Sequence, residues 1–225
     1  MQRKLLPYLK PTYFIDSDNE TIIELAESAC RECSTEISKA TALYYKIRDS
    51  IRYDPYDLEY SREAMRASSI VLKQSGYCVA KAVVLAAVAR QQGIPSRLGF
   101  ADVTNHLSTP KLRKLMGTNL FIYHGYTEMF LAGRWVKATP AFNLELCDRF
   151  KVKPLDFDGT TDSIFHEYDA LGQKHMEYVH DHGTFEDLPF ERIFTAYGRV
   201  YPNFFENFGS SKTTTGIQGR DKNFL

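Results

Sequence analysis

The sequence has no excess of charge of either sign, because 28 lysine and arginine residues balance 28 aspartate and glutamate residues. A dedicated nucleic-acid-binding protein usually carries a basic stripe, so we expect no nucleic-acid partner. Long apolar runs are also missing. The longest, Val79 to Ala89, is shorter than the roughly 18 residues that a membrane-spanning helix requires, and Lys81 interrupts it. We therefore expect no membrane association.

Cysteine is scarce, with four residues at positions 30, 33, 78 and 147. The start of the chain lacks the apolar segment of a secretory signal, so we expect a cytoplasmic location. Disulfides are rare in cytosolic proteins, and none is expected here. Cys30 and Cys33 form a C-x-x-C inside a helical pattern, whereas a redox motif belongs at a strand-to-helix turn. We therefore interpret them as small residues of a helix.

Metal-binding patterns are missing as well. A zinc site would need a second cysteine pair at suitable spacing, and none exists. Four histidines, at positions 166, 175, 180 and 182, lie in a polar stretch near the C-terminus, but the carboxylates around them show no recognised ligand spacing. We expect residues 157–169 and 183–193 to form a rim or lid over a cleft. We expect no metal and no organic cofactor.

The remaining composition is that of an ordinary folded protein, with 44% hydrophobic and 25% charged residues. The length suits one domain. We expect this domain to span residues 1–207, with a core at about 40–145 and a C-terminal extension at about 146–207. The polar tail at 208–225 is expected to be disordered.

The N-terminal part, up to about Arg52, shows helical periodicity. Asp16 or Ser17 is the expected N-cap of its first helix. A short helix is expected near residues 62–68, after a loop rich in tyrosine and aspartate. These elements place helices at the start of the fold.

The middle of the chain changes from helix to strand. Residues Cys78 to Gln92 are apolar almost all round, which indicates a helix buried inside the domain. Gly93 and Pro95 end it, and a strand pattern follows at residues 96–103. Two further strand patterns flank a turn at Ala132-Gly133. This order predicts an α+β fold, in which helices pack on an antiparallel sheet.

Cys78 stands at the point where a loop becomes the buried helix. Unpaired N–H groups and the positive end of the helix dipole favour the thiolate, which is the nucleophilic form of cysteine. The same N–H groups can receive an oxyanion. Free cysteine is also a common core residue. The position alone therefore leaves packing and catalysis open.

His124 lies on the first strand of the expected hairpin, where it shares one face with Tyr126, Glu128 and Phe130. A cysteine nucleophile needs a base within hydrogen-bond reach, and histidine is the usual one. A cysteine that opens a buried helix, followed by a histidine on a strand, favours nucleophilic catalysis over packing.

These residues resemble the transglutaminase-like superfamily, the papain-like fold shared by transglutaminases and bacterial cysteine-protease homologues. Its pattern is a G-x-C that opens a helix, an A-R-x-x-G-I-P-x-R that ends it, and an H-x-W/Y-x-E followed by G-x-W. The matching residues are Gly76, Cys78, Ala89, Arg90, Gly93, Ile94, Pro95, Arg97, His124, Tyr126, Glu128, Gly133 and Trp135. The resemblance covers roughly residues 40 to 145 and implies a Cys78 nucleophile with a His124 base.

The third catalytic residue of the resembled family is missing. That family usually has an aspartate on the return strand, where this chain has Thr139. A two-residue turn would place Thr139 opposite Tyr126, so we expect the partner of His124 between Thr139 and Asn143. Threonine can accept a hydrogen bond from the imidazole, and asparagine completes the Cys–His–Asn sites of papain-like proteases. Both residues remain candidates.

Four further residues are candidates for oxyanion or substrate binding. Gln74 and Tyr77 precede the cysteine, and either could assist the Cys78 N–H in an oxyanion hole. Tyr126 and Glu128 share the strand face of His124.

The resemblance implies thiol-dependent acyl transfer or amide hydrolysis on a peptide or another amide-containing substrate. Whether water or an amine accepts the acyl group is left open. The alternative is a catalytically inactive binding or scaffold module, because the resembled fold is also used without catalysis and the expected aspartate is absent. The oligomeric state is not predicted.

Overall fold

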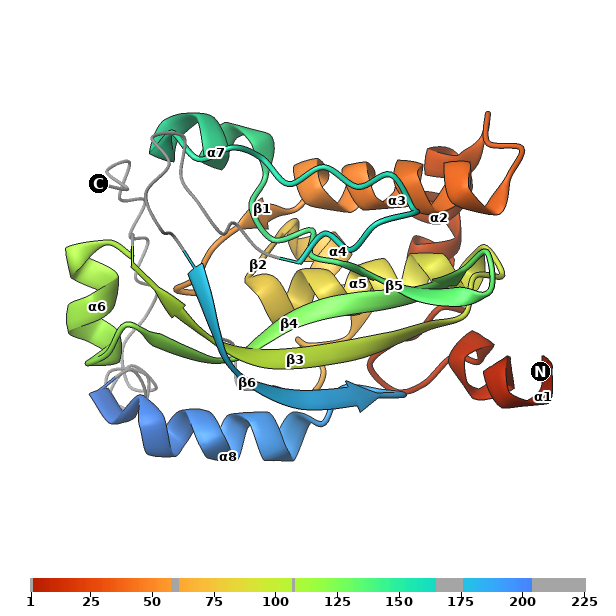
Figure 1. The fold of residues 1–225 in the computed structure, drawn as a ribbon. Coiled ribbons are helices and arrows are strands. Elements are labelled where there is room, and N and C mark those ends of the chain that lie inside the picture. Colours follow the sequence, from red (N-terminus) through yellow and green to blue (C-terminus); the bar gives the residue numbers. More distant parts are fainter. Residues whose placement is uncertain (1, 58–60, 107, 165–175, 204–225) are drawn as a thin grey trace.

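The computed structural model describes residues 2–57, 61–106, 108–164 and 176–203. A four-stranded sheet forms one layer, and helices lie against it (Figure 1). All neighbouring strands of this sheet run antiparallel, in the order β5-β4-β3-β6. The strands are β3 (Ser96–Asn105), β4 (Leu120–Leu131), β5 (Arg134–Ala138) and β6 (Met176–Phe185). This architecture confirms the predicted α+β class.

The predicted hairpin is formed by β4 and β5. Leu131 pairs with Arg134 across a two-residue turn, in which Ala132 and Gly133 have φ values of 48° and 85°. Two positive φ angles are typical of the tight turn that matches the twist of antiparallel strands. The ladder continues as far as the pair Thr127 and Ala138, which is the last pair of β4 with β5.

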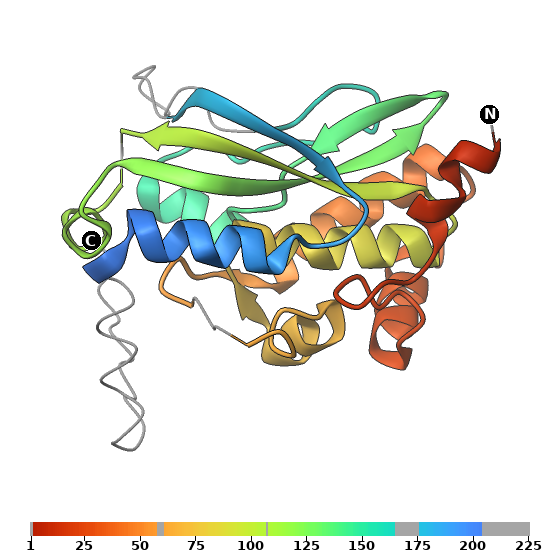
Figure 2. The ribbon, with the colours of Figure 1, turned by 90° about the horizontal axis from the view of Figure 1, so that it is seen from below.

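The buried helix is α5 (Cys78–Gln91), and it begins at the predicted cysteine. It packs against β4 and against three N-terminal helices, α2 (Glu20–Cys30), α3 (Glu36–Ser50) and α4 (Ala67–Lys73). Figure 2 shows α5 beside α8 (Phe190–Val200) along one face of the sheet. Every residue from Cys78 to Arg90 is buried. This confirms the prediction, from the apolar residues on all sides of the helix, that the helix lies inside the domain.

Two basic side chains of α5 are buried with it. The Nζ atom of Lys81 donates to the carbonyl oxygens of Arg48 (2.7 Å) and Ile51 (2.6 Å), where α3 ends. The Arg90 guanidinium donates to the carbonyl oxygen of Ser96, from Nε at 3.2 Å and from Nη2 at 2.9 Å. Carbonyl groups thus accept hydrogen bonds from both basic side chains, as burial of a polar group requires.

The other elements are short. Two residue pairs, Arg52 with Ser75 and Tyr53 with Gly76, form a parallel ladder just before α5. The elements not yet named are α1 (Gln2–Leu5), η1 (Leu6–Leu9), β1 (Arg52–Tyr53), β2 (Ser75–Gly76), α6 (Pro110–Met116) and α7 (Leu144–Phe150).

Two details of the sequence interpretation were wrong. The N-cap of α2 is Asn19, whose Oδ1 accepts from Thr21 N at 3.0 Å. Asp16 instead accepts hydrogen bonds from the backbone N–H and the hydroxyl of Ser68. The short helix expected near residues 62–68 begins later, at Ala67. Helix α7 and strand β6 are further elements, which were not predicted.

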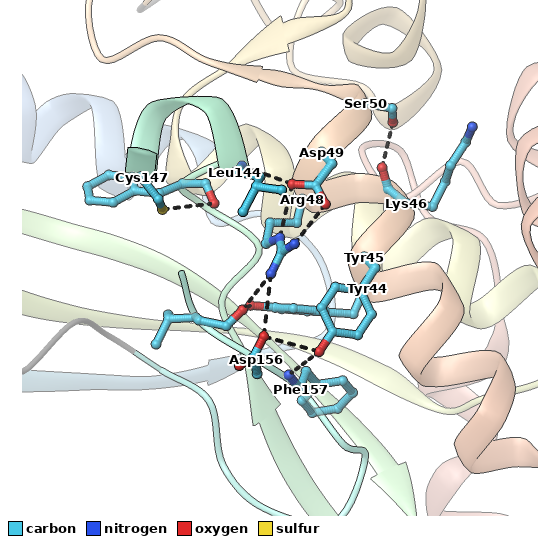
Figure 3. Close-up of polar contacts among 12 residues, drawn as sticks. Tyr44, Tyr45, Lys46, Arg48, Asp49, Ser50, Leu144, Cys147, Asp156 and Phe157 are labelled. Carbon is cyan, nitrogen blue, oxygen red and sulfur yellow. Dashed lines mark hydrogen bonds and ion pairs between the residues drawn. The ribbon is translucent and has the colours of Figure 1, made fainter. Parts of the chain in front are cut away.

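Helix α7 is held against α3 by a polar cluster (Figure 3). Oδ1 of Asp49 accepts from the Leu144 N–H at 3.0 Å and from Nε of Arg48 at 3.0 Å. Nη1 of Arg48 also donates to the Leu155 carbonyl oxygen at 2.9 Å. The hydroxyl of Tyr44 reaches the same carbonyl at 3.0 Å. These contacts anchor α7 and the segment that follows it on a helix of the N-terminal layer.

The described part of the chain contains no helix with the length and apolar character that crossing a bilayer demands. The tail at 208–225, for which we expect disorder, lies outside the described residues.

Candidate active site

Cys78 is the first residue of α5, and the chain around it is closely packed. Its predecessor Tyr77 is the N-cap and makes no side-chain capping bond. On β4, a Cβ atom at Gly125 would lie 2.8 Å from the Cα atom of Val79, closer than two such atoms can approach. Glycine therefore lets β4 cross directly against the first turn of α5. This contact brings the strand that carries His124 to the cysteine.

Burial dominates the chemistry of the Cys78 thiol. It raises the pKa of the thiol to about 11, although the backbone N–H groups of Gly125, Val79 and Cys78 itself point at the sulfur and lower the pKa. A helix N-terminus was expected to favour the thiolate. The N–H groups act in the predicted direction, but they do not offset the loss of water around a side chain that is 8% exposed. The resting thiol is protonated at neutral pH.

His124 is buried on β4, where it pairs with Ala101 of β3. Burial lowers the pKa of its imidazole to about 4, so the ring is neutral at pH 7. Its Nε2 atom is enclosed and has no hydrogen-bond partner among the residues that the structure describes. A neutral imidazole can accept a proton, which is what a general base requires.

Cys78 and His124 line one cavity, named here the Cys78 cavity. It encloses about 410 Å³ of space, part of which is open to solvent. The other lining residues are mostly aromatic or apolar: Tyr53, Pro55, Tyr77, Met116, Phe121, Ile122, Tyr197 and Tyr201. The structure thus brings the two predicted catalytic side chains to a shared cavity, without a hydrogen bond between Sγ and Nε2.

Neither candidate for the third residue bonds to His124. Thr139 donates its hydroxyl to the Ile164 carbonyl oxygen at 2.8 Å, and its N–H to the Ser163 carbonyl oxygen at 2.7 Å. The return strand leaves β4 after Ala138, so Thr139 does not pair with Tyr126. Oδ1 of Asn143 accepts from the Tyr53 N–H at 3.2 Å. Asn143 therefore supports a residue that lines the Cys78 cavity, but it does not line the cavity itself.

Of the four candidates for oxyanion or substrate binding, only Tyr77 lines the Cys78 cavity. Gln74 is exposed at the end of α4, with a φ of 57°. Glu128 forms an ion pair with Arg97 at 2.6 Å. Tyr126 packs against Gly99, where an added Cβ atom would lie 2.2 Å from its ring. Glu128 and Tyr126 thus join β3 to β4, and neither lines the Cys78 cavity.

Three tyrosines of the cavity were not predicted. Tyr53 comes from β1, whereas Tyr197 and Tyr201 come from α8 and the residue after it. Burial raises the pKa of Tyr53 and of Tyr197 well above the ordinary value, so both hydroxyls stay protonated. The sequence showed runs rich in tyrosine around these positions, but nothing in it linked them to Cys78.

A polar arrangement next to His124 also escaped prediction. Tyr123 has a φ of 53°, and its N–H donates to Oδ1 of Asp102 at 2.9 Å. The same oxygen contacts Nε2 of His182 at 2.6 Å. The His182 ring stacks on that of Tyr123, with centroids 3.8 Å apart. These contacts hold the irregular backbone immediately before His124.

The histidines of the C-terminal part do not gather into a ligand set. Within residues 2–57, 61–106, 108–164 and 176–203, no group of three histidine, cysteine, aspartate or glutamate side chains could hold a metal ion. His166 and His175 lie outside the described residues.

A second cavity, named here the apolar chamber, adjoins the first. It encloses about 780 Å³ of space, part of which is open to solvent. Tyr53, Pro55, Phe121 and His124 line both cavities. The chamber is otherwise lined by Tyr56, Val103, Asn105, Ser108, Thr109, Leu112, Phe142, Leu146, Cys147, Phe150, Val152 and Met176. Cys78 lines only the first cavity, so His124 stands between the two.

The chain is similar to known proteins in sequence and in structure. The sequence pattern of the transglutaminase-like superfamily matches residues 23–140, a range that includes Cys78 and His124. A solved structure of a "putative cysteine protease" from Cytophaga hutchinsonii is similar over 81% of this chain, with 17% identity and a TM-score of 0.47. The chain covers 54% of that protein, about half of its length. No curated protein matches the sequence. Because the superfamily pattern matches more than half of its residues, the chain belongs to the transglutaminase-like superfamily.

Proposed function

We propose that the protein catalyses thiol-dependent acyl transfer or amide hydrolysis, with Cys78 as the nucleophile and His124 as the base. One observation carries the proposal: the buried thiol at the start of α5 lines the same cavity as an imidazole that is neutral at pH 7. The substrate class is a peptide or another amide.

The reaction begins with transfer of the thiol proton to His124. Sγ of Cys78 then attacks the carbonyl carbon, and the N–H groups around the sulfur stabilise the oxyanion that forms. When the intermediate collapses, the C–N bond breaks and the imidazolium gives its proton to the departing nitrogen. Water or an amine next attacks the thioester and loses a proton through His124, which restores the thiol.

Two observations favour the alternative, an inactive binding or scaffold module. His124 has no carboxylate partner among the described residues, and Sγ makes no hydrogen bond to Nε2. In a module of this kind, Cys78 would be a buried core thiol, and its reactivity would follow its raised pKa alone.

Alkylation of Cys78 by iodoacetamide distinguishes the enzyme from the inactive module. Without a base, a thiol with a pKa of about 11 gains reactivity about tenfold per pH unit between about pH 6 and pH 9. His124 is already deprotonated over this range, since its pKa is about 4. General-base help from His124 adds a contribution to the rate that does not change over this range. We therefore expect Cys78 to be labelled faster near pH 6, with a flatter profile, in the wild type than in His124→Ala. Peptide mass spectrometry gives the rate at each cysteine.

Cys30 is the internal control. Burial, together with Cys33, raises the pKa of Cys30 to about 11, the same value as for Cys78. Its labelling should rise about tenfold per pH unit in both proteins. A wild-type Cys78 profile that is as steep as that of Cys30 would refute the enzymatic proposal and leave the inactive module.

A further inference from the structure

We propose that the apolar chamber binds the hydrocarbon part of the amine in this reaction. The same subsite would hold the amine that leaves a cleaved amide and the amine that accepts the acyl group, because one step is the reverse of the other. The inference rests on the proposed function and adds a substrate class to it.

The walls of the chamber are suited to a neutral hydrocarbon. Helix α7 contributes Leu146 and Phe150, while β3 and β4 contribute Val103 and Phe121. Among the described residues that line it, none has a charged side chain. Its polar members, such as Asn105, are neutral. A cavity with apolar walls and a few neutral polar groups is typical of a site for a small organic group.

The position of His124 assigns the chamber to the amine side of the substrate. The acyl group is bonded to Cys78 during the reaction, so it stays in the Cys78 cavity. The amine nitrogen exchanges a proton with the imidazole and must therefore lie beside it. His124 lines both cavities, whereas Cys78 lines only one. A substituent on a nitrogen placed at His124, and directed away from Cys78, extends into the apolar chamber.

An amine held there is well placed to react. Its nitrogen attacks the thioester carbonyl, the C–S bond breaks, and a proton passes from the nitrogen through His124 to the sulfur. Binding converts this attack into a reaction between groups that are already together. Amines with a large apolar substituent should therefore clear the acyl group faster than small amines do.

The test uses p-nitrophenyl acetate to form S-acetyl-Cys78, with release of p-nitrophenol. Phenethylamine or ethylamine is then added at equal concentrations of free base, and loss of the acetyl group is followed by intact mass. Burial of the phenyl ring should make phenethylamine at least about tenfold faster than ethylamine, with N-phenethylacetamide as the product. Rates with the two amines that differ less than about twofold would overturn the inference.

Two variants of α7 locate the effect. Leu146 lines the chamber, whereas Leu144 is 45% exposed and does not line it. Leu146→Trp should fill the chamber and bring the ratio of the two amine rates close to one. Leu144→Trp, which adds the same side chain to the same helix, should keep the wild-type ratio. If both variants keep it, the amine does not bind in the chamber.

A binding measurement tests ligand binding in the apolar chamber even if the proposed reaction does not occur. If no S-acetyl-Cys78 forms, the proposed function fails. Saturation-transfer NMR with N-phenethylacetamide and Cys78→Ala then tests the chamber alone. Binding that Leu146→Trp abolishes would support the site without the reaction, and absence of binding would overturn the inference.

Discussion

Replacing Gly125 with alanine is expected to lower the free energy of unfolding by about 1–3 kcal/mol and to slow alkylation of Cys78 about 100-fold at pH 7. The new Cβ atom would lie 2.8 Å from the Cα atom and 3.3 Å from the backbone nitrogen of Val79. Backbone atoms of a buried helix cannot turn aside as a flexible side chain can. Strand β4 must therefore move away from α5, and His124 moves with it.

Chemical denaturation and the iodoacetamide assay measure the two effects of Gly125→Ala. Gly198→Ala in α8 is the matched control, because a Cβ atom there would meet no atom of the described residues within 4 Å. Alanine is also the better helix former, so this variant should be slightly stabilised, by up to about 1 kcal/mol. If Gly125→Ala unfolds like the wild type and Cys78 keeps its reactivity, the close contact between β4 and α5 does not position the two catalytic groups.

The two segments that carry Cys78 and His124 could be predicted because their signals are local. The apolar run of α5 ends at Gly93, which has a φ of 77°, so its boundaries follow from neighbouring residues. The hairpin follows from strand patterns around a two-residue turn. The boundaries of both elements therefore follow from residues that are close together in the sequence.

The surroundings of the site depend on contacts between distant residues. Strand β6 is an exposed edge strand, where His180, Asp181 and Gly183 are all exposed, so burial imposes no alternation on it. The hairpin register is correct up to Ala138, which then forms a parallel bridge with Ser163. That bridge turns Thr139 away from β4. Local turn geometry could not reveal it.

The protonation state of Cys78 also depends on distant residues and could not be predicted from local sequence. A helix N-terminus can be predicted from sequence, and so can its effect on a thiol. The degree of burial depends on tyrosines from β1 and α8, which are distant along the chain. Burial is the larger effect here, and it reverses the expected shift of the pKa.

Replacing Lys81 with methionine should remove a dependence of stability on pH that the wild type shows. Burial lowers the pKa of this lysine from its ordinary value of 10.5 to about 7. Between these values the unfolded chain binds the proton and the folded chain does not, so the stability of the wild type rises with pH. The linkage relation gives a gain of roughly 2 kcal/mol between pH 6.5 and pH 9, which Lys81→Met should lack.

Near pH 10, where the wild type has gained nearly all of its pH-dependent stability, the same substitution should lower stability. Methionine has a similar length, but it leaves the carbonyl oxygens of Arg48 and Ile51 without the Nζ donor at the end of α3. Two buried acceptors that lose their partner cost roughly 2–4 kcal/mol. Urea denaturation at several pH values separates this loss from the change with pH.

Lys46→Met is the matched control, because Lys46 is an exposed lysine on α3. It should reproduce the wild-type gain between pH 6.5 and pH 9. If Lys81→Met shows the same gain, another group causes the dependence on pH. Because Lys81 lies one turn beyond Cys78 and joins α5 to α3, a loss of stability in Lys81→Met should be accompanied by slower alkylation of Cys78. Unchanged alkylation would mean that β4 alone positions the thiol.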